Sequence, residues 1–275
     1  MSIITIVGAG MMGSAIGFPA RENGHEVRLV GTHLDREIID HAKKTNTHLT
    51  LKRPFPEGFK FYQIEQLEEA MQGADVLVGG VSSFGVDWFA ENILPKVPET
   101  LPVLSITKGM QDLEDGTMIS FPHLYAERLG DKKLCLNAVG GPCTSYELAD
   151  HDPTLVAFCG PDIEVLRRLK AIFETDYYHI CLSTDVTGVE CAVAMKNAYA
   201  LAVSLAVGLS ERIEGVGGTL HYNSQAALFA QSIREMRRLL KLIGGHDDNI
   251  VYGVGDLYVT IFCGRTRKIG TLLGR

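Results

Sequence analysis

The chain has 275 residues, and its 33 acidic and 26 basic side chains give a formal net charge of −7. This acidic balance gives no support for binding to nucleic acid or to a membrane surface, so an anionic ligand would need a local site. The six cysteines form no C-x-x-C pair and no histidine pair has zinc-like spacing, so we expect no metal and a reducing, cytoplasmic location.

The chain opens with an apolar, β-branched run at residues 2–7, followed by glycines at positions 8, 10 and 13. The run predicts a buried strand, residues 14–24 predict a helix, and residues 25–31 predict a second strand. A G-x-G-x-x-G pattern in such a βαβ unit is typical of a dinucleotide site, although a buried strand with a tight turn has the same glycines. Because the chain enters this strand without a basic leader, we expect no signal peptide.

Each glycine of this loop has its own expected task. Gly8 permits the tight turn, Gly10 lets the backbone approach a pyrophosphate, and Gly13 lets the helix pack close to the strand. The first N–H groups of the helix then face the phosphates. Met11 and Met12 lie in the same loop, and we expect them to contact the cofactor.

The choice between NAD and NADP stays open at this stage. An acidic residue at the end of the second strand would bind the ribose hydroxyls of NAD. Thr32 and His33 stand where that acid, or an arginine for NADP, would be expected. Asp35 lies about twenty residues after Gly13, as the rule requires, but beyond the expected end of the strand.

Strands and helices continue to alternate as far as residue 183, which predicts a doubly wound sheet of the Rossmann type. The expected strands are 75–81, 101–107, 133–142, 154–160 and 177–184, and the expected helices are 65–74, 84–94, a short one within 115–130, and 162–175.

The pattern changes after residue 184. Residues 185–213 predict one long helix, residues 223–245 predict a second helix with Asn223 as its N-cap, and we expect a short tail of mixed structure. The fold class is therefore α/β: a Rossmann-type domain at residues 1–183 and an all-α domain at residues 184–275. Such a pair suggests a cleft in which the substrate faces the nicotinamide.

One apolar stretch, residues 191–209, has the length of a membrane span. It contains Lys196 and Asn197, and a lysine at the centre of a bilayer helix costs roughly 2.5–3.5 kcal/mol on insertion scales. We therefore expect a helix buried in a soluble domain, with no membrane insertion.

Two lysines are candidates for chemistry. Lys196 lies in an otherwise apolar helix, where an ammonium without a purpose would be costly; the alternative is a lysine that extends its charged end to solvent. Lys108 follows a strand at the sheet edge where α/β proteins bind ligands, although an ordinary loop lysine would look the same.

Four further side chains are weaker candidates. Asp256 follows glycines and could equally be a turn residue, and Arg265 could hold a phosphate or simply belong to a solvated basic face. Ser82 follows a strand and could contact the cofactor. Cys143 has no evident charged partner, which favours a plain thiol over a nucleophile.

Taken together, these motifs resemble the NAD(P)-dependent glycerol-3-phosphate dehydrogenase family over nearly the whole chain. The matching segments occur in order: GAGMMG at 8–13, TKG at 107–109, GGPCTSYELA at 140–149, GVECAVAMKNAYALA at 188–202, NSQAAL at 223–228 and GDLYVTIFCGRTR at 255–267. The ordered set is far more specific than any one motif.

The resemblance implies an enzyme that interconverts dihydroxyacetone phosphate and glycerol 3-phosphate with NAD or NADP. It implies that Lys196 is the acid/base and that Lys108 is a second cation of the site. It also implies roles for other side chains that match the family: Asp256 and Thr260 as active-site acid and threonine, Arg265 on the substrate phosphate, and Asn197 and Asn223 lining the cleft.

Two departures from the family pattern bear on affinity and completeness. Thr266 replaces the asparagine of the family's GRN sequence, which helps to hold cofactor or phosphate. Family members also usually continue past GTLLGR with further helices, so we expect an incomplete α domain, with lower stability or activity unless a homodimer partner covers its exposed face. The alternatives are a reductase of another small oxo acid and a catalytically weak NAD(P)-binding sensor.

Overall fold

The computed structural model describes residues 1–262 and 264–275, so Cys263 lies outside the described residues. The chain divides into two compact units. The N-terminal unit holds residues 1–139 and 143–186, and the C-terminal unit holds residues 140–142 and 187–275.

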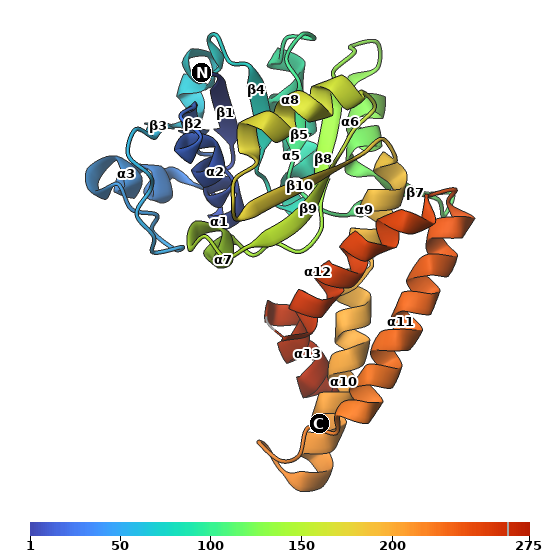
Figure 1. The fold of residues 1–275 in the computed structure, drawn as a ribbon. Helices are drawn as coiled ribbons and strands as arrows, with labels where there is room; N and C mark the ends of the chain where they lie inside the picture. Colours follow the sequence, from blue (N-terminus) through green and yellow to red (C-terminus); the bar gives the residue numbers. More distant parts are fainter. Residues whose placement is uncertain (263) are drawn as a thin grey trace. The chain divides into compact units, whose positions relative to one another are not determined.

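The N-terminal unit is built on one eight-stranded sheet, visible in Figure 1. Its strand order is β10-β9-β8-β5-β4-β1-β2-β3. The first strands are added on one side of β1 and the later strands on the other, so the switch point of the sheet lies between β1 and β4. The pairs on either side of β1 are parallel. The strands are β1 (Ile3–Val7), β2 (Glu26–Val30), β3 (Lys60–Tyr62), β4 (Val76–Gly79), β5 (Val103–Ser105), β8 (Leu136–Gly140), β9 (Thr154–Cys159) and β10 (Tyr178–Ser183).

Helices cover both faces of this sheet, because successive side chains of a strand point to opposite faces and both sets are apolar. In β1, Ile4 and Ile6 belong to one core cluster, while Val7 belongs to the other. The helices are α1 (Met11–Ala15), α2 (Gly17–Glu22), α3 (Arg36–Thr45), α4 (Leu67–Met71), α5 (Val86–Asn92), α6 (Phe121–Leu129), α7 (Ser145–Ala149) and α8 (Ile163–Phe173), with 3₁₀ turns η1 (Ile64–Gln66), η2 (Ser83–Gly85) and η3 (Leu94–Lys96).

The C-terminal unit is helical, as Figure 1 shows in orange and red. Its elements are α9 (Val186–Ala194), α10 (Lys196–Glu214), α11 (Tyr222–Leu242), η4 (Asp247–Asn249), α12 (Ile250–Phe262) and α13 (Gly264–Gly274). Helices α10 and α13 run in the same direction at very close range. A Cβ on Gly270 would lie 2.6 Å from the Leu201 carbonyl oxygen, and one on Gly274 would overlap that of Leu205.

The predicted fold class is confirmed: a doubly wound α/β unit is followed by a helical one. Several local predictions are wrong. The long helix of residues 185–213 is interrupted at Met195. Asn223 is not an N-cap, because α11 already begins at Tyr222, after His221 in the left-handed region. The tail is not mixed but forms the two helices α12 and α13.

Five elements have no counterpart among the predicted ones. They are α3, α7, β3 and the two strands of a small antiparallel hairpin, β6 (Met110–Asp112) and β7 (Met118–Ser120). The turn of this hairpin contains Asp115, whose carboxylate accepts hydrogen bonds from the N–H and the hydroxyl of Thr117.

Within the described residues, the stretch Val186–Glu214 is long and apolar enough to cross a membrane. About half of its most apolar window is buried inside the protein, which is how the core helix of a globular unit behaves.

Candidate cofactor site and lysine pair

A cavity of about 500 Å³ opens in the N-terminal unit where the sheet changes direction, between β1 and β4. Open α/β sheets bind their ligands at such switch points. Leu34 and Phe84 contribute exposed apolar side chains to its lining. The full lining is Gly8, Gly10, Thr32, His33, Leu34, Asp35, Gly80, Val81, Ser82, Phe84, Gly85 and Trp88.

The glycine loop fits a dinucleotide. Gly8 has φ +112°, and a Cβ there would lie 2.6 Å from the Gly80 backbone, while a Cβ on Gly13 would overlap the Gly8 carbonyl oxygen. By contrast, nothing lies within 4 Å of the place where a Cβ on Gly10 would stand. That open space, at the start of α1, is where a pyrophosphate can approach the backbone.

Helix α1 carries the two methionines that were predicted to contact the cofactor. Met11, at the start of the helix, is partly exposed, and Met12 packs against the core of the unit. Of the pair, Met11 is therefore the one with its side chain open to a ligand.

Other predicted cofactor ligands have distinct surroundings. Thr32 lines the cavity, but its side chain is buried and its hydroxyl donates to Asp35 Oδ2 over 2.7 Å. Ser82 is exposed at the cavity, directly before η2. Lys108 is half-buried just after β5.

The structure brings Lys196 and Asp256 together within the C-terminal unit. Lys196 Nζ lies 2.7 Å from Asp256 Oδ1; the lysine side chain is 19% exposed and the carboxylate side chain 3% exposed. An almost fully buried carboxylate needs such a partner. Lys196 is the first residue of α10, where the interruption at Met195 places it, and Asp256 comes from α12.

Three other predicted site residues lie near Lys196 or Asp256 in the sequence. Thr260 donates from its hydroxyl to the Asp256 carbonyl oxygen over 2.6 Å, within α12. Asn197 follows Lys196, and its Oδ1 accepts a hydrogen bond from the Thr266 hydroxyl over 3.2 Å. Thr266 therefore ties the start of α13 to the start of α10.

Arg265 and Asn223 are exposed on the C-terminal unit. Arg265 lies in the first turn of α13, one residue before Thr266. Asn223 lies in the first turn of α11. Cys143 is a half-buried free thiol.

Sequence reasoning missed the two side chains that hold the glycine loop. Asp35 Oδ2 accepts from the Ala9 N–H over 3.1 Å, and His48 Nε2 lies 3.0 Å from the Ala9 carbonyl oxygen. Neither residue belongs to the loop motif. An aspartate directly before helix α3 was a possible signal for Asp35, because this residue type is favoured there; His48 carried no such signal.

A glycine loop of this shape at the switch point of a doubly wound sheet is typical of the NAD(P)-dependent oxidoreductases, and the chain is an enzyme of that class. The family model for the N-terminal part of NAD-dependent glycerol-3-phosphate dehydrogenase matches residues 3–165, and the model for the C-terminal part matches residues 185–275. The chain therefore belongs to the NAD-dependent glycerol-3-phosphate dehydrogenase family, and its cofactor is NAD or NADP.

Relatives agree over the full chain. The NADP(+)-dependent glycerol-3-phosphate dehydrogenase of Archaeoglobus fulgidus is 33% identical over 275 residues, which cover 99% of this chain and 80% of that protein. The glycerol-3-phosphate dehydrogenase [NAD(P)+] of Koribacter versatilis is 29% identical, over 100% of this chain and 79% of that protein. These matches support neither of the alternatives, a reductase of another oxo acid or a weakly catalytic sensor.

Solved structures show the same fold. Glycerol-3-phosphate dehydrogenase from Coxiella burnetii has a TM-score of 0.83 and 24% identity, covering 99% of this chain and 80% of its own. The enzyme from Plasmodium falciparum has a TM-score of 0.84 and 22% identity, covering 98% and 75%.

Proposed function

We propose that the chain reduces dihydroxyacetone phosphate to glycerol 3-phosphate, and runs the reverse reaction, with Lys196 as the proton donor and acceptor. The observation that carries this proposal is the 2.7 Å contact between Lys196 Nζ and the buried carboxylate of Asp256. The Lys196 side chain is 19% exposed, so solvent reaches part of it while the carboxylate of Asp256 fixes the direction of its ammonium.

The bound cofactor supplies or takes the hydride. Lys196 donates a proton to the ketone oxygen as negative charge builds on it, and takes the proton back in the reverse direction. Asp256 holds the ammonium in position before transfer. Thr260, bonded to the Asp256 backbone, is proposed to line the same site.

The substrate phosphate is assigned to the start of α13. Arg265 is exposed there, and its guanidinium can bind a phosphate with two parallel hydrogen bonds. The Asn197–Thr266 bond supports this placement, because it ties the first turn of α13 to the residue next to Lys196. Binding energy at the phosphate then helps to align the reacting carbon.

Two further predicted ligands stay proposals. Lys108, after β5, is proposed as a second cation of the reaction, since it lies at the carboxyl edge of the sheet where α/β proteins bind ligands. Asn223 is proposed as a substrate ligand from the first turn of α11, on the strength of the family pattern.

The test replaces the proposed proton donor. Lys196→Met should lower single-turnover oxidation of NAD(P)H by dihydroxyacetone phosphate by about 10²- to 10⁴-fold, as for other lost general acids. Lys241→Met, at the end of α11, is the matched control and should behave like the parent. A Lys196→Met protein that keeps most of the parent's single-turnover rate would remove Lys196 from the mechanism.

We also propose a homodimer that assembles in the cytoplasm without membrane insertion. Exposed apolar side chains on α10 and α13 support the dimer: Leu209, Ile213, Leu272 and Leu273 are 52–73% exposed. The five described cysteines are free thiols, as is usual in a reducing compartment. Light scattering that gives the mass of one chain at micromolar concentration would contradict the dimer.

A further inference from the structure

Asp35, the acidic residue considered above for ribose binding, forms hydrogen bonds with the protein's own backbone and with Thr32. Asp35 Oδ2 accepts three hydrogen bonds: from the Thr32 N–H over 2.8 Å, the Thr32 hydroxyl over 2.7 Å and the Ala9 N–H over 3.1 Å. Three donors on one oxygen fix the direction of a carboxylate. Asp35 thus joins the end of β2 to the middle of the glycine loop.

The other side of the same peptide is held by a buried histidine. His48 is fully buried, and its Nδ1 accepts from the backbone N–H groups of Thr50 and Leu51, over 3.2 and 3.0 Å. A nitrogen that accepts carries no proton, so Nε2 carries the proton and donates it to the Ala9 carbonyl oxygen. Ala9, between Gly8 and Gly10, is therefore fixed through both its N–H and its C=O.

The rim of the cavity, in the segment that follows β2, offers hydrogen-bond donors to a ligand. Asp35 is the one carboxylate among the residues that line the cavity. His33 is exposed there, its ring 5.4 Å from that of Trp88. Its backbone N–H and ring nitrogens take part in none of the hydrogen bonds between the described residues. Thr32 is already engaged, because its hydroxyl donates to Asp35 and accepts from the Leu34 N–H.

We propose that Asp35 and His48 are positioning residues of the glycine loop, and that His33 at the rim receives a 2′-phosphate, so that the chain prefers NADP to NAD. The inference rests on dinucleotide binding by this loop and does not depend on the identity of the proton donor. A carboxylate at the ribose favours NAD through its hydroxyls and repels a 2′-phosphate. Here Oδ2 of that carboxylate is occupied by three donors of its own unit, and the rim offers an imidazole and a backbone N–H to an anion.

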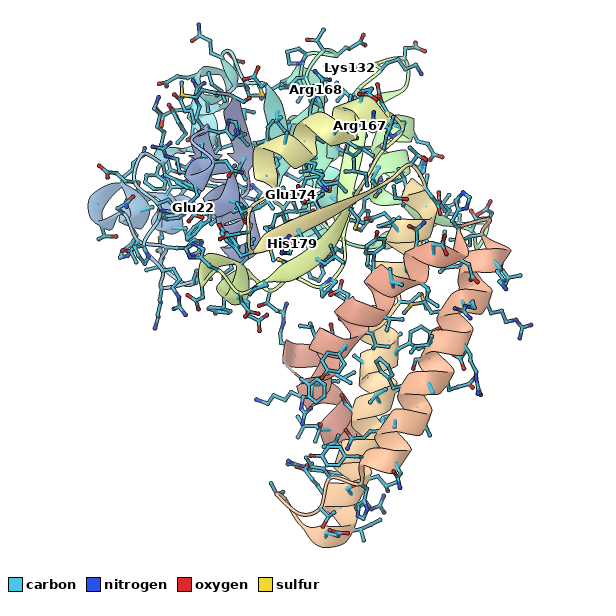
Figure 2. All side chains as sticks on the ribbon, in the orientation of Figure 1. Glu22, Lys132, Arg167, Arg168, Glu174 and His179 are labelled. Carbon is cyan, nitrogen blue, oxygen red and sulfur yellow. The ribbon has the colours of Figure 1, made fainter. Side chains whose placement is uncertain are left out.

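The experiment measures equilibrium binding by calorimetry, with NADP⁺, NAD⁺, adenosine 2′-monophosphate and adenosine 5′-monophosphate as probes. The parent should bind NADP⁺ about 10- to 100-fold more tightly than NAD⁺, and the 2′-monophosphate more tightly than the 5′-monophosphate, because a charge-assisted contact is worth that factor. His33→Asp should reverse the order. His179→Asp, on β10 and labelled in Figure 2, is the matched control and should keep the parent's order.

Asp35→Asn separates positioning from direct contact. Replacing the charged acceptor of the loop by a neutral amide should weaken NADP⁺ and NAD⁺ by the same factor, about 10-fold, whereas loss of a ribose ligand would weaken NAD⁺ alone. Glu37→Gln removes an exposed carboxylate two residues further on and serves as its control. If Asp35→Asn does not fold, the order of NADP⁺ and NAD⁺ affinities in His33→Asp decides the proposal alone. Tighter binding of NAD⁺ than NADP⁺ by the parent, or an unchanged order in His33→Asp, overturns the proposal while leaving the Lys196 mechanism untouched.

Discussion

The loop at residues 8–13 is shaped by backbone contacts, whereas Lys196 pairs with the carboxylate of a residue on another helix. In the N-terminal unit, Gly8 and Gly13 approach neighbouring backbone too closely for any side chain, and the bonds to Ala9 come from two different segments. In the C-terminal unit Lys196 forms an ion pair with Asp256. We infer that the cofactor loop is shaped by the backbone itself, whereas proton transfer depends on the side chains of Lys196 and Asp256, so that a single substitution can remove it.

The largest effect should follow loss of the carboxylate of that pair. Asp256→Asn should lower turnover by about 10²-fold or more, because the ammonium loses the partner that directs it. It should also lower the free energy of unfolding by about 3 kcal/mol, the cost of leaving a largely buried charge without its counterion. Stopped-flow kinetics and urea unfolding measure the two effects.

The double variant Asp256→Asn with Lys196→Met sharpens the same point. It removes the ammonium together with the carboxylate that paired with it, and should recover most of the lost stability without recovering any turnover. Additive losses of stability in the double variant would mean that the two side chains do not act as a pair.

Substitutions at two glycines of the same loop should have different effects, one on stability and the other on cofactor binding. Gly13→Ala pushes a Cβ into the Gly8 carbonyl and should lower the free energy of unfolding by about 1–3 kcal/mol, the usual cost of overpacking. Gly10→Val enters open space, so it should leave stability unchanged and abolish NAD(P) binding. Thermal unfolding and calorimetry distinguish them, and equal stability losses would contradict the assignment of Gly10.

Arg265 should affect substrate binding alone. Arg265→Ala should raise KM for dihydroxyacetone phosphate about 10- to 100-fold, since a charge-assisted contact is lost, and should change stability by less than about 0.5 kcal/mol. Arg267→Ala is an instructive comparison, because Arg267 donates to the Ile261 carbonyl oxygen over 2.6 Å and should reduce stability instead. If the two variants have the same KM, the phosphate lies elsewhere.

The smallest effect concerns pH. Burial lowers the pKa of His48, partly opposed by its hydrogen bond to Ala9 and by the charge of Asp35, with His41 acting in the same direction as burial. A histidine whose pKa is lowered by folding contributes full stability above the unfolded value of about 6.5, and that contribution is lost as the pH falls below it. The slope of unfolding free energy between pH 7 and 5 should therefore be shallower in His48→Gln than in the parent; parallel curves would contradict this.

Much of the N-terminal unit was predictable, because strands and turns there follow local patterns. Residues 2–7 form a buried strand and the glycines have the expected spacing, so both were found. The tail was mispredicted because its β-branched and glycine-rich residues have low helix propensity. Helix α12 forms because tertiary packing overrides that propensity: a Cβ on Gly253 would lie 2.5 Å from the Ala192 carbonyl oxygen.

The limits of prediction at the site have the same origin. Lys196 stands out as a charge in an apolar segment, so a local pattern was enough to single it out. Its partner Asp256 lies 60 residues away, and Asp35 and His48 act on Ala9 from 26 and 39 residues away. Spacing in the sequence carries no information on such pairs, which only the folded chain brings together.

The most direct test of this separation of tasks is NADPH binding, measured by fluorescence titration for Lys196→Met and Gly10→Val side by side. We predict that Lys196→Met binds NADPH within about twofold of the parent while its turnover is lost, and that Gly10→Val shows no binding although it is folded. A Lys196→Met protein that fails to bind NADPH, or a Gly10→Val protein that binds it like the parent, would contradict the account.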